Sequence, residues 1–143
     1  MKKIERTFTV AKPAAQVWEY LSDFRSTNDW DPGTVKTTLE SGDGAVGSVY
    51  RNISKFAGKE VEIIYTVTKV EPGRQITLVG ETGALTSTDT ITVEGTTVGS
   101  EVTYEAQFVF HGVAKLAEPL MGLPLKKLGD DAKKSLEKTL RAL

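Results

Sequence analysis

The sequence lacks cysteine, has a single histidine, and carries no excess of either charge sign. It contains 18 Lys and Arg residues and 19 Asp and Glu residues, which gives a formal net charge of −1. Without cysteine the chain forms no disulfide, thiolate zinc site or iron–sulfur cluster, and one histidine cannot supply a multi-histidine metal site. No basic run offers a footprint for a phosphate backbone. We therefore expect no metal, no cofactor and no nucleic-acid partner.

Long apolar runs and internal repeats are also missing. No stretch approaches the roughly 18 apolar residues of a membrane span, so we expect no integral membrane segment. No repeat or Pro/Gly/Ser linker divides the 143 residues, and this length predicts one domain, residues 1–143, with a genuine hydrophobic core. We expect a soluble, cytoplasmic monomer or homodimer.

Short alternating runs, separated by single glycines, fill most of the chain. Ile4, Phe8 and Val10 share one parity of a half-buried strand, and only Arg6 interrupts its apolar face. Pro13 then opens an amphipathic helix over residues 13–22, and the polar segment that follows has room for about one more helical turn. Turn-separated runs rich in Val, Ile and Thr predict six further antiparallel strands, at 34–40, 46–56, 60–71, 74–81, 84–94 and 100–111.

A helical period replaces the alternation after His111. Apolar residues recur every three or four positions from Leu125 to Leu143, which predicts a long C-terminal helix. Pro119 and Pro124 each remove a backbone donor, so the stretch 113–124 should be kinked or broken. The chain is thus an α+β protein: a seven-stranded antiparallel sheet, two short helices between its first two strands, and a long helix at the end.

This order of elements, together with local sequence, resembles the helix-grip superfamily of START-like and birch-pollen-allergen-like proteins. The run Ala11-Lys12-Pro13-Ala14-Ala15-Gln16-Val17-Trp18-Glu19-Tyr20-Leu21-Ser22-Asp23, then Trp30-Asp31-Pro32 and Gly47-Ser48, is similar to the polyketide cyclase/dehydrase and lipid-transport branch. The resemblance covers the whole chain and implies a curved sheet wrapped around the C-terminal helix. It also implies a cavity between them that holds an apolar small molecule.

Asp89 is the most informative polar residue. Leu85, Ile91 and Val93 set the inward parity of their strand, and the same parity turns Ser87 and Asp89 inward. Asp89 then serves as a ligand anchor or an acid/base group, beside Ser87 and the phenol of Tyr104. Two structural explanations compete with this one. A β-bulge between residues 87 and 91 turns Asp89 to solvent, or Asp89 pairs with Arg6.

Other candidates for the ligand pocket follow from the layout that the resemblance implies. Trp30 lies in the loop that the family places at the cavity mouth, where it is either pocket wall or plain packing, whereas Trp18 belongs to the core. Tyr50 and Tyr65 are weaker candidates because the parities of their strands are ambiguous. The apolar residues that the resemblance places against the gap between sheet and helix are Phe108, Phe110, Leu120, Met121 and Leu125.

Two further features are better explained by structure than by chemistry. Gly42-Asp43-Gly44-Ala45-Val46-Gly47 matches the G-x-G-x-x-G string of dinucleotide-binding proteins, but a strand follows it instead of a helix, so we interpret it as a hairpin turn. His111 shares the outward parity of its strand, and no serine or aspartate is placed to complete a nucleophilic triad with it.

Three functions fit this pattern. The first is binding, transport or sequestration of a small hydrophobic ligand, such as a lipid or a polyketide, with access through 113–124 and the Trp30 loop. The second is a polyketide cyclase or dehydratase in which Asp89 and Tyr104 are the catalytic candidates for acid/base chemistry. The third is a protein-interaction module without a ligand, which a solid core and a large exposed apolar patch would favour.

Overall fold

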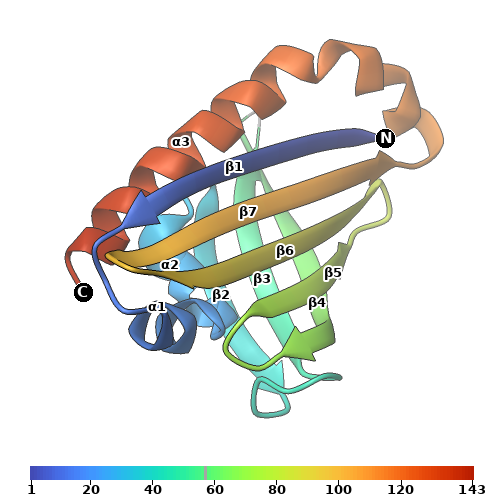
Figure 1. Ribbon diagram of the computed structural model, residues 1–143. Helices are drawn as coiled ribbons and strands as arrows, with labels where there is room; N and C mark the ends of the chain where they lie inside the picture. Colours follow the sequence, from blue (N-terminus) through green and yellow to red (C-terminus); the bar gives the residue numbers. More distant parts are fainter. Residues whose placement is uncertain (57) are drawn as a thin grey trace.

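One antiparallel sheet dominates the computed structural model, which describes residues 1–56 and 58–143 (Figure 1). Its order is β1-β7-β6-β5-β4-β3-β2, so only the β1–β7 pair joins strands that are distant in the chain. The strands are β1 (Lys2–Val10), β2 (Thr34–Ser41), β3 (Val49–Phe56), β4 (Lys59–Glu71), β5 (Gln75–Glu81), β6 (Leu85–Thr96) and β7 (Gly99–Phe110). The predicted sheet is confirmed.

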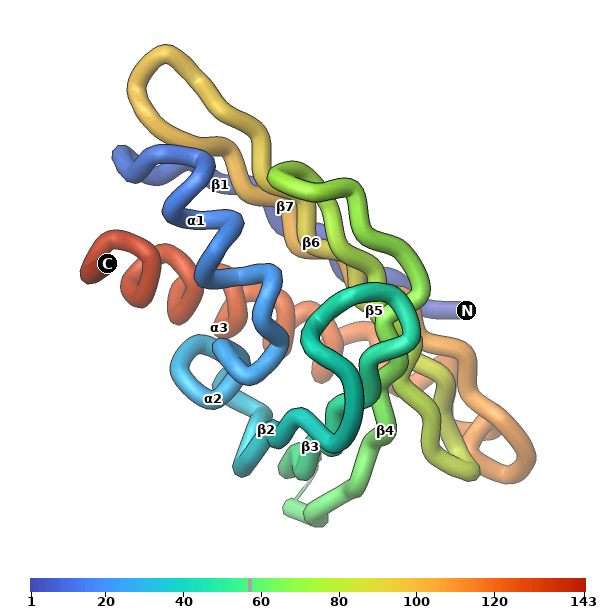
Figure 2. Tube along the Cα trace, turned by 90° about the horizontal axis from the view of Figure 1, so that it is seen from below, coloured from blue at the N-terminus to red at the C-terminus, as the bar shows by residue number. Residues whose placement is uncertain are grey.

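Helices occupy two places in the chain. Between β1 and β2 lie three short ones: α1 (Ala14–Leu21), the 3-10 helix η1 (Phe24–Ser26) and α2 (Thr27–Trp30). After β7 come the 3-10 helix η2 (Gly112–Leu120) and the long α3 (Gly122–Arg141). Figure 2 shows α1, α2 and α3 on the same side of the sheet. Of the described residues, none belongs to a helix long and apolar enough to cross a membrane.

The predicted break in 113–124 is confirmed at Met121, where η2 ends and α3 begins. Pro119 lies within η2, and Pro124 lies in the first turn of α3, where a backbone N–H has no helical acceptor and its loss is harmless. The two prolines therefore set the start of the long helix without bending its interior.

The α3 helix lies close to β1, at the edge of the sheet (Figure 1). Its buried stripe includes Leu125, Ala132 and Leu136. Arg6 of β1 donates from Nε to Oδ1 of Asp130 at 3.0 Å, and its guanidinium passes over Gly129. A Cβ atom at position 129 would lie 3.0 Å from Arg6 Cζ, so the absent side chain allows the helix to approach the strand. The residue that interrupts the apolar face of β1 thus ties β1 to α3.

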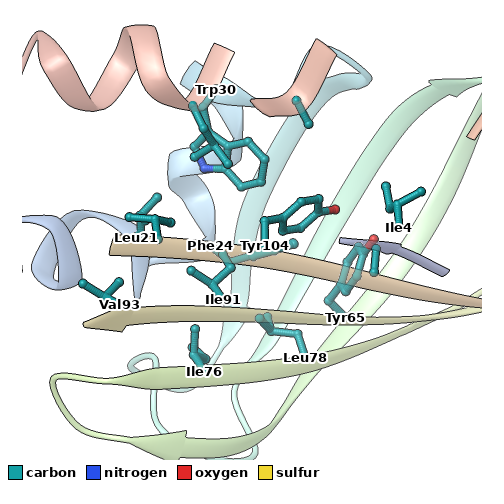
Figure 3. Close-up of a cluster of buried hydrophobic side chains, with 14 of the residues drawn as sticks. Ile4, Leu21, Phe24, Trp30, Tyr65, Ile76, Leu78, Ile91, Val93 and Tyr104 are labelled. Carbon is teal, nitrogen blue, oxygen red and sulfur yellow. The ribbon is translucent and has the colours of Figure 1, made fainter. Parts of the chain in front are cut away.

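The core is packed at one end of the sheet. Leu21 and Phe24 fill the space over Ile76, Ile91 and Val93, with Trp30 above them (Figure 3). Tyr65 and Tyr104 lie next to this cluster, and in Figure 3 their hydroxyl groups point away from it, towards the end where Ile4 lies. The two tyrosines therefore lie at the border of this packed cluster.

Candidate functional site

A cavity of about 250 Å³ lies between the sheet and α3. Its walls are mostly apolar, and its polar side chains come from four strands, from the end of α2 and from the turn between β5 and β6. The lining residues are Asp31, Gly33, Ser54, Lys55, Phe56, Val61, Ile63, Tyr65, Thr82, Ala84, Leu85, Ser87, Asp89, Tyr104, Phe108, Phe110, Ala114, Leu125, Leu128 and Ala132. Pockets of this composition, apolar with few polar groups, are typical of small-molecule sites.

Asp89 is 5% exposed and faces this cavity from β6. The Ser87 hydroxyl donates to Oδ1 at 2.7 Å, and the Tyr104 hydroxyl donates to Oδ2 at 3.3 Å. Burial raises the pKa of Asp89 to about 7; the Ser87 hydrogen bond opposes this rise, and the negative charge of Asp31 adds to it. The carboxyl group therefore changes its charge near neutral pH, inside an apolar pocket.

The two structural alternatives for Asp89 are wrong. β6 pairs with β7 in an unshifted register from Leu85 to Thr96, so no bulge turns Asp89 outward. Arg6 is taken by Asp130 on α3 and is not part of the cavity wall. The inward parity predicted from the sequence therefore holds from Ser87 to Val93.

Asp31 is a second carboxylate in the wall, and it is held by a polar network. Its Oδ1 accepts from the backbone N–H of Gly33 at 3.0 Å and its Oδ2 from the Thr34 hydroxyl at 2.9 Å. The Thr34 hydroxyl accepts in turn a hydrogen bond from the amide Nδ2 of Asn52 on β3. The amide Oδ1 of Asn52 accepts a hydrogen bond from the Ser54 hydroxyl. Burial raises the pKa of Asp31 against these hydrogen bonds. The carboxylate at the end of α2 is thus fixed in the cavity wall by β2 and β3.

The phenols of Tyr65 and Tyr104 also belong to the polar part of the cavity wall. Burial raises the pKa of both well above the usual value, and the negative charge of Asp89 adds to the rise. Both groups therefore stay protonated and act as neutral hydrogen-bonding groups. Tyr104 is held from behind by Trp30, whose ring meets it edge-on at 5.5 Å.

Most of the candidates predicted from the sequence do meet in this cavity. The structure brings together seven of them in its wall: Tyr65, Ser87, Asp89, Tyr104, Phe108, Phe110 and Leu125. Their roles in binding stay predictions.

Four candidates lie outside the cavity wall. Trp30 is buried behind Tyr104, with its indole N–H on the Ser26 hydroxyl, so it is packing and not the mouth. Tyr50 packs against Phe24 and lines a separate, more open hollow of about 260 Å³ that also contains the Asp23–Arg25 ion pair. Leu120 is 78% exposed, and Met121 is half-buried at the end of η2, because η2 continues past the end of the sheet.

Asp31 is one of several lining residues that the sequence analysis missed, because a carboxylate beside proline and glycine is typical of a turn. Asp31 does lie in such a turn, directly after the last residue of α2. Val61 and Ile63 also line the cavity, and their alternation with Tyr65 along β4 could have resolved the ambiguous parity of that strand. Leu128 and Ala132 continue the helical stripe that begins at Leu125.

The predictions for the glycine-rich segment and for His111 are both confirmed. The segment from Gly42 to Gly47 is a turn, with positive φ angles at Gly42, Gly44 and Gly47, and no helix follows it. His111 is exposed, and its Nε2 pairs with the Thr86 hydroxyl at 2.8 Å, outside the cavity wall.

Comparison with known protein families assigns the chain. Residues 1–142 match the family described as polyketide cyclase/dehydrase and lipid transport. The chain belongs to this family. No curated protein matches the sequence significantly.

Solved structures share the fold of this family member at low sequence identity. The Zhui aromatase/cyclase from Streptomyces sp. R1128 is 20% identical, with 99% of this chain and 96% of that chain covered and a TM-score of 0.74. A START superfamily protein from Mycobacterium smegmatis is 17% identical, with 98% and 94% covered and a TM-score of 0.74. Ara h 8.0201 is 16% identical, with 99% of both chains covered and a TM-score of 0.70. These matches establish the helix-grip fold.

Proposed function

We propose that the protein binds a small, mainly apolar molecule in the cavity, with a hydrogen-bond donor of the ligand held by Asp89. The observation that supports this most strongly is the position of an ionisable carboxyl group within an apolar cavity of about 250 Å³. An empty apolar space of that size would cost about 6 kcal/mol at 24 cal/mol per Å³. The free energy of unfolding of a whole domain is only about 5–15 kcal/mol, so an empty cavity would use up a large part of it. We therefore expect a ligand or water to fill this space.

The hydrogen bonds of Asp89 favour a ligand that donates. An ionised carboxylate has about four acceptor positions, and Ser87 and Tyr104 use two of them. A hydroxyl or amine group of a ligand can occupy those left. A ligand carboxylate placed beside Asp89 would be repelled by Asp89 and Asp31, since both face the same cavity, although Lys55 in the wall is a cation.

A cyclase or dehydratase activity is the second candidate, and the pKa of Asp89 near 7 favours it. At that pKa the carboxylate could remove a proton from carbon next to a substrate carbonyl near neutral pH. Tyr104 would then stabilise the enolate oxygen, but its only proton points at Asp89. Catalysis would require that bond to break and reform on the substrate. Binding requires no such change, and we therefore place it first.

A pure interaction module is less well supported, because the interior under α3 is not solid.

Thermal-shift and calorimetric titration with decanol, decylamine and decanoate at pH 8 test the binding proposal. We expect decanol and decylamine to raise the melting temperature and to bind one molecule per chain. The variant Ala132→Leu, which adds a side chain inside the cavity, should abolish this binding. The matched control Ala142→Leu lies on the exposed surface and should bind as the wild type does. If none of the three probes binds, or if Ala132→Leu binds them unchanged, the proposal fails.

A further inference from the structure

Four large apolar side chains stand in solvent at the end of the molecule where η2 meets α3. Val113, Leu116, Leu120 and Leu123 are between 78% and 87% exposed, and no residue of η2 is buried. We call these four residues the apolar patch. Figures 1 and 2 both show the segment projecting beyond the end of the sheet. A soluble surface rarely carries so many exposed apolar residues in one short segment unless another body covers them.

The patch lies beside the mouth of the cavity. Of the apolar cavity-lining residues, Phe56 and Ala84 are exposed and Ala114 is half-buried, and we infer from these three that the cavity opens here. Ala114 belongs to η2 itself. The turn carrying Ala84 is tied to the start of η2, because its carbonyl accepts from the N–H of His111 at 2.8 Å. Whatever covers the patch therefore also faces the opening.

The charge around the patch is positive, although the whole chain carries −1. Residues 112–127 contain Lys115, Lys126 and Lys127 and a single acid, Glu118. Lys127 is paired with Asp131 at 2.7 Å, whereas among the described residues no ion pair joins Lys115 or Lys126 to an acid. The N-terminal ammonium group lies 2.8 Å from Glu118 and neutralises it. Apolar side chains flanked by lysines suit a surface that is anionic outside and apolar beneath, which describes a lipid leaflet with acidic headgroups.

We propose that the segment 113–127 docks on an anionic lipid bilayer, with the apolar patch in the headgroup region and the lysines against lipid phosphates. A second copy of this chain fits the patch less well. A twofold interface sets the same surface against itself, so it would bring the lysines of both copies together. Docking as such does not depend on the cavity ligand. Only the corollary, that a ligand can pass between bilayer and cavity mouth, rests on the proposed function.

Sedimentation with lipid vesicles tests the docking. The 143-residue chain is mixed with vesicles of phosphatidylcholine containing phosphatidylglycerol, and in parallel with vesicles of phosphatidylcholine alone. We expect co-sedimentation with the anionic vesicles, at least about tenfold weaker binding to the neutral ones, and weakening by added salt.

Matched variants locate the surface. The double variant Leu116→Glu/Leu120→Glu should lose at least about tenfold in vesicle binding, because both side chains are exposed and neither contributes to the core. The control Val98→Glu introduces one negative charge at a valine that is 79% exposed, at the other end of β7, roughly 36 Å away. It should bind as the wild type does. Lys115→Glu/Lys126→Glu should lose the preference for anionic vesicles.

Several results would overturn the proposal. They are equal binding to both vesicle types, no binding to either, or equal loss in the patch variant and in Val98→Glu. A wild-type dimer in gel filtration that becomes a monomer in Leu116→Glu/Leu120→Glu would assign the patch to a second copy instead. A failure of decanol and decylamine to bind would contradict the proposed function alone, since the vesicle assay contains neither.

Discussion

The Ser87 hydroxyl donates a 2.7 Å hydrogen bond to Asp89, two residues further along the same strand. Residues i and i+2 of a strand share a face, so one local contact fixes both the position and the partner of the buried carboxyl group. Tyr104 approaches its other oxygen from the neighbouring strand at 3.3 Å. The two donors favour the carboxylate and burial favours the protonated acid. Their balance is a pKa of about 7, which the dependence of stability on pH tests.

Asp89 should make stability depend on pH in a specific direction. The native carboxyl group keeps its proton up to about pH 7, whereas the unfolded one loses it near pH 4. The native state thus binds more protons between these values, and the free energy of unfolding falls as pH rises through that window. Above pH 7 the contribution is lost and the curve flattens.

The variant Asp89→Asn removes this dependence. Relative to the wild type it should gain stability from pH 4 to pH 7, by up to about 4 kcal/mol, with no further gain above pH 7. Urea unfolding at several pH values measures the free energy of unfolding of both proteins. The contributions of the other carboxyl groups cancel in the difference between the two. A difference that does not vary with pH between 4 and 8 would show that Asp89 is ionised throughout.

Gly80 should be intolerant of substitution because it supports a cavity wall. It pairs with Tyr65 across β4 and β5, and a Cβ atom at position 80 would overlap the Tyr65 ring. That ring is also held by Phe24 at 4.7 Å. We expect Gly80→Ala to cost about 1–3 kcal/mol in thermal or urea unfolding and to weaken ligand binding. Gly83→Ala, at a glycine with open space around it, is the control and should change little.

Gly129 and Arg6 should be energetically coupled. Alanine in place of a helical glycine stabilises a helix by about 1 kcal/mol, but here the new methyl group would press on the guanidinium group that binds Asp130. We expect Gly129→Ala to stabilise the Arg6→Ala protein by more than it stabilises the wild type, with a coupling of about 0.5–1 kcal/mol. A double-mutant cycle measures this. Additive effects would mean that Arg6 moves aside at no cost.

Much of the fold was predictable because its determinants are local. The alternation from Ile4 to Val10 and the helical period from Leu125 onward are read directly from side-chain spacing. Pro119 and Pro124 act on their own backbone, and they correctly predict the break before α3. Asp89 was also predictable as an inward-facing residue, since parity is a property of its own strand.

The rest of the site depends on contacts between distant segments. Asp31 enters the cavity wall only because Thr34 and Gly33 hold it where β2 and β3 meet. Trp30 is a residue type often found in ligand pockets, yet here it is buried and packs edge-on against Tyr104. Leu120 follows an apolar pattern, but the sheet ends before reaching it. The spacing of apolar residues within one segment does not show where a neighbouring strand or helix ends.

The most direct test of the account compares decanol with decanoate in the wild type and in Asp89→Asn, by calorimetric titration at pH 8, where Asp89 is ionised. Both probes carry the same chain and differ in whether the head group donates a hydrogen bond or carries a negative charge. We predict that the wild type prefers decanol and that Asp89→Asn reduces this preference at least about tenfold, or 1.4 kcal/mol. An unchanged preference, or an absence of binding by both probes, would contradict a ligand cavity anchored by Asp89.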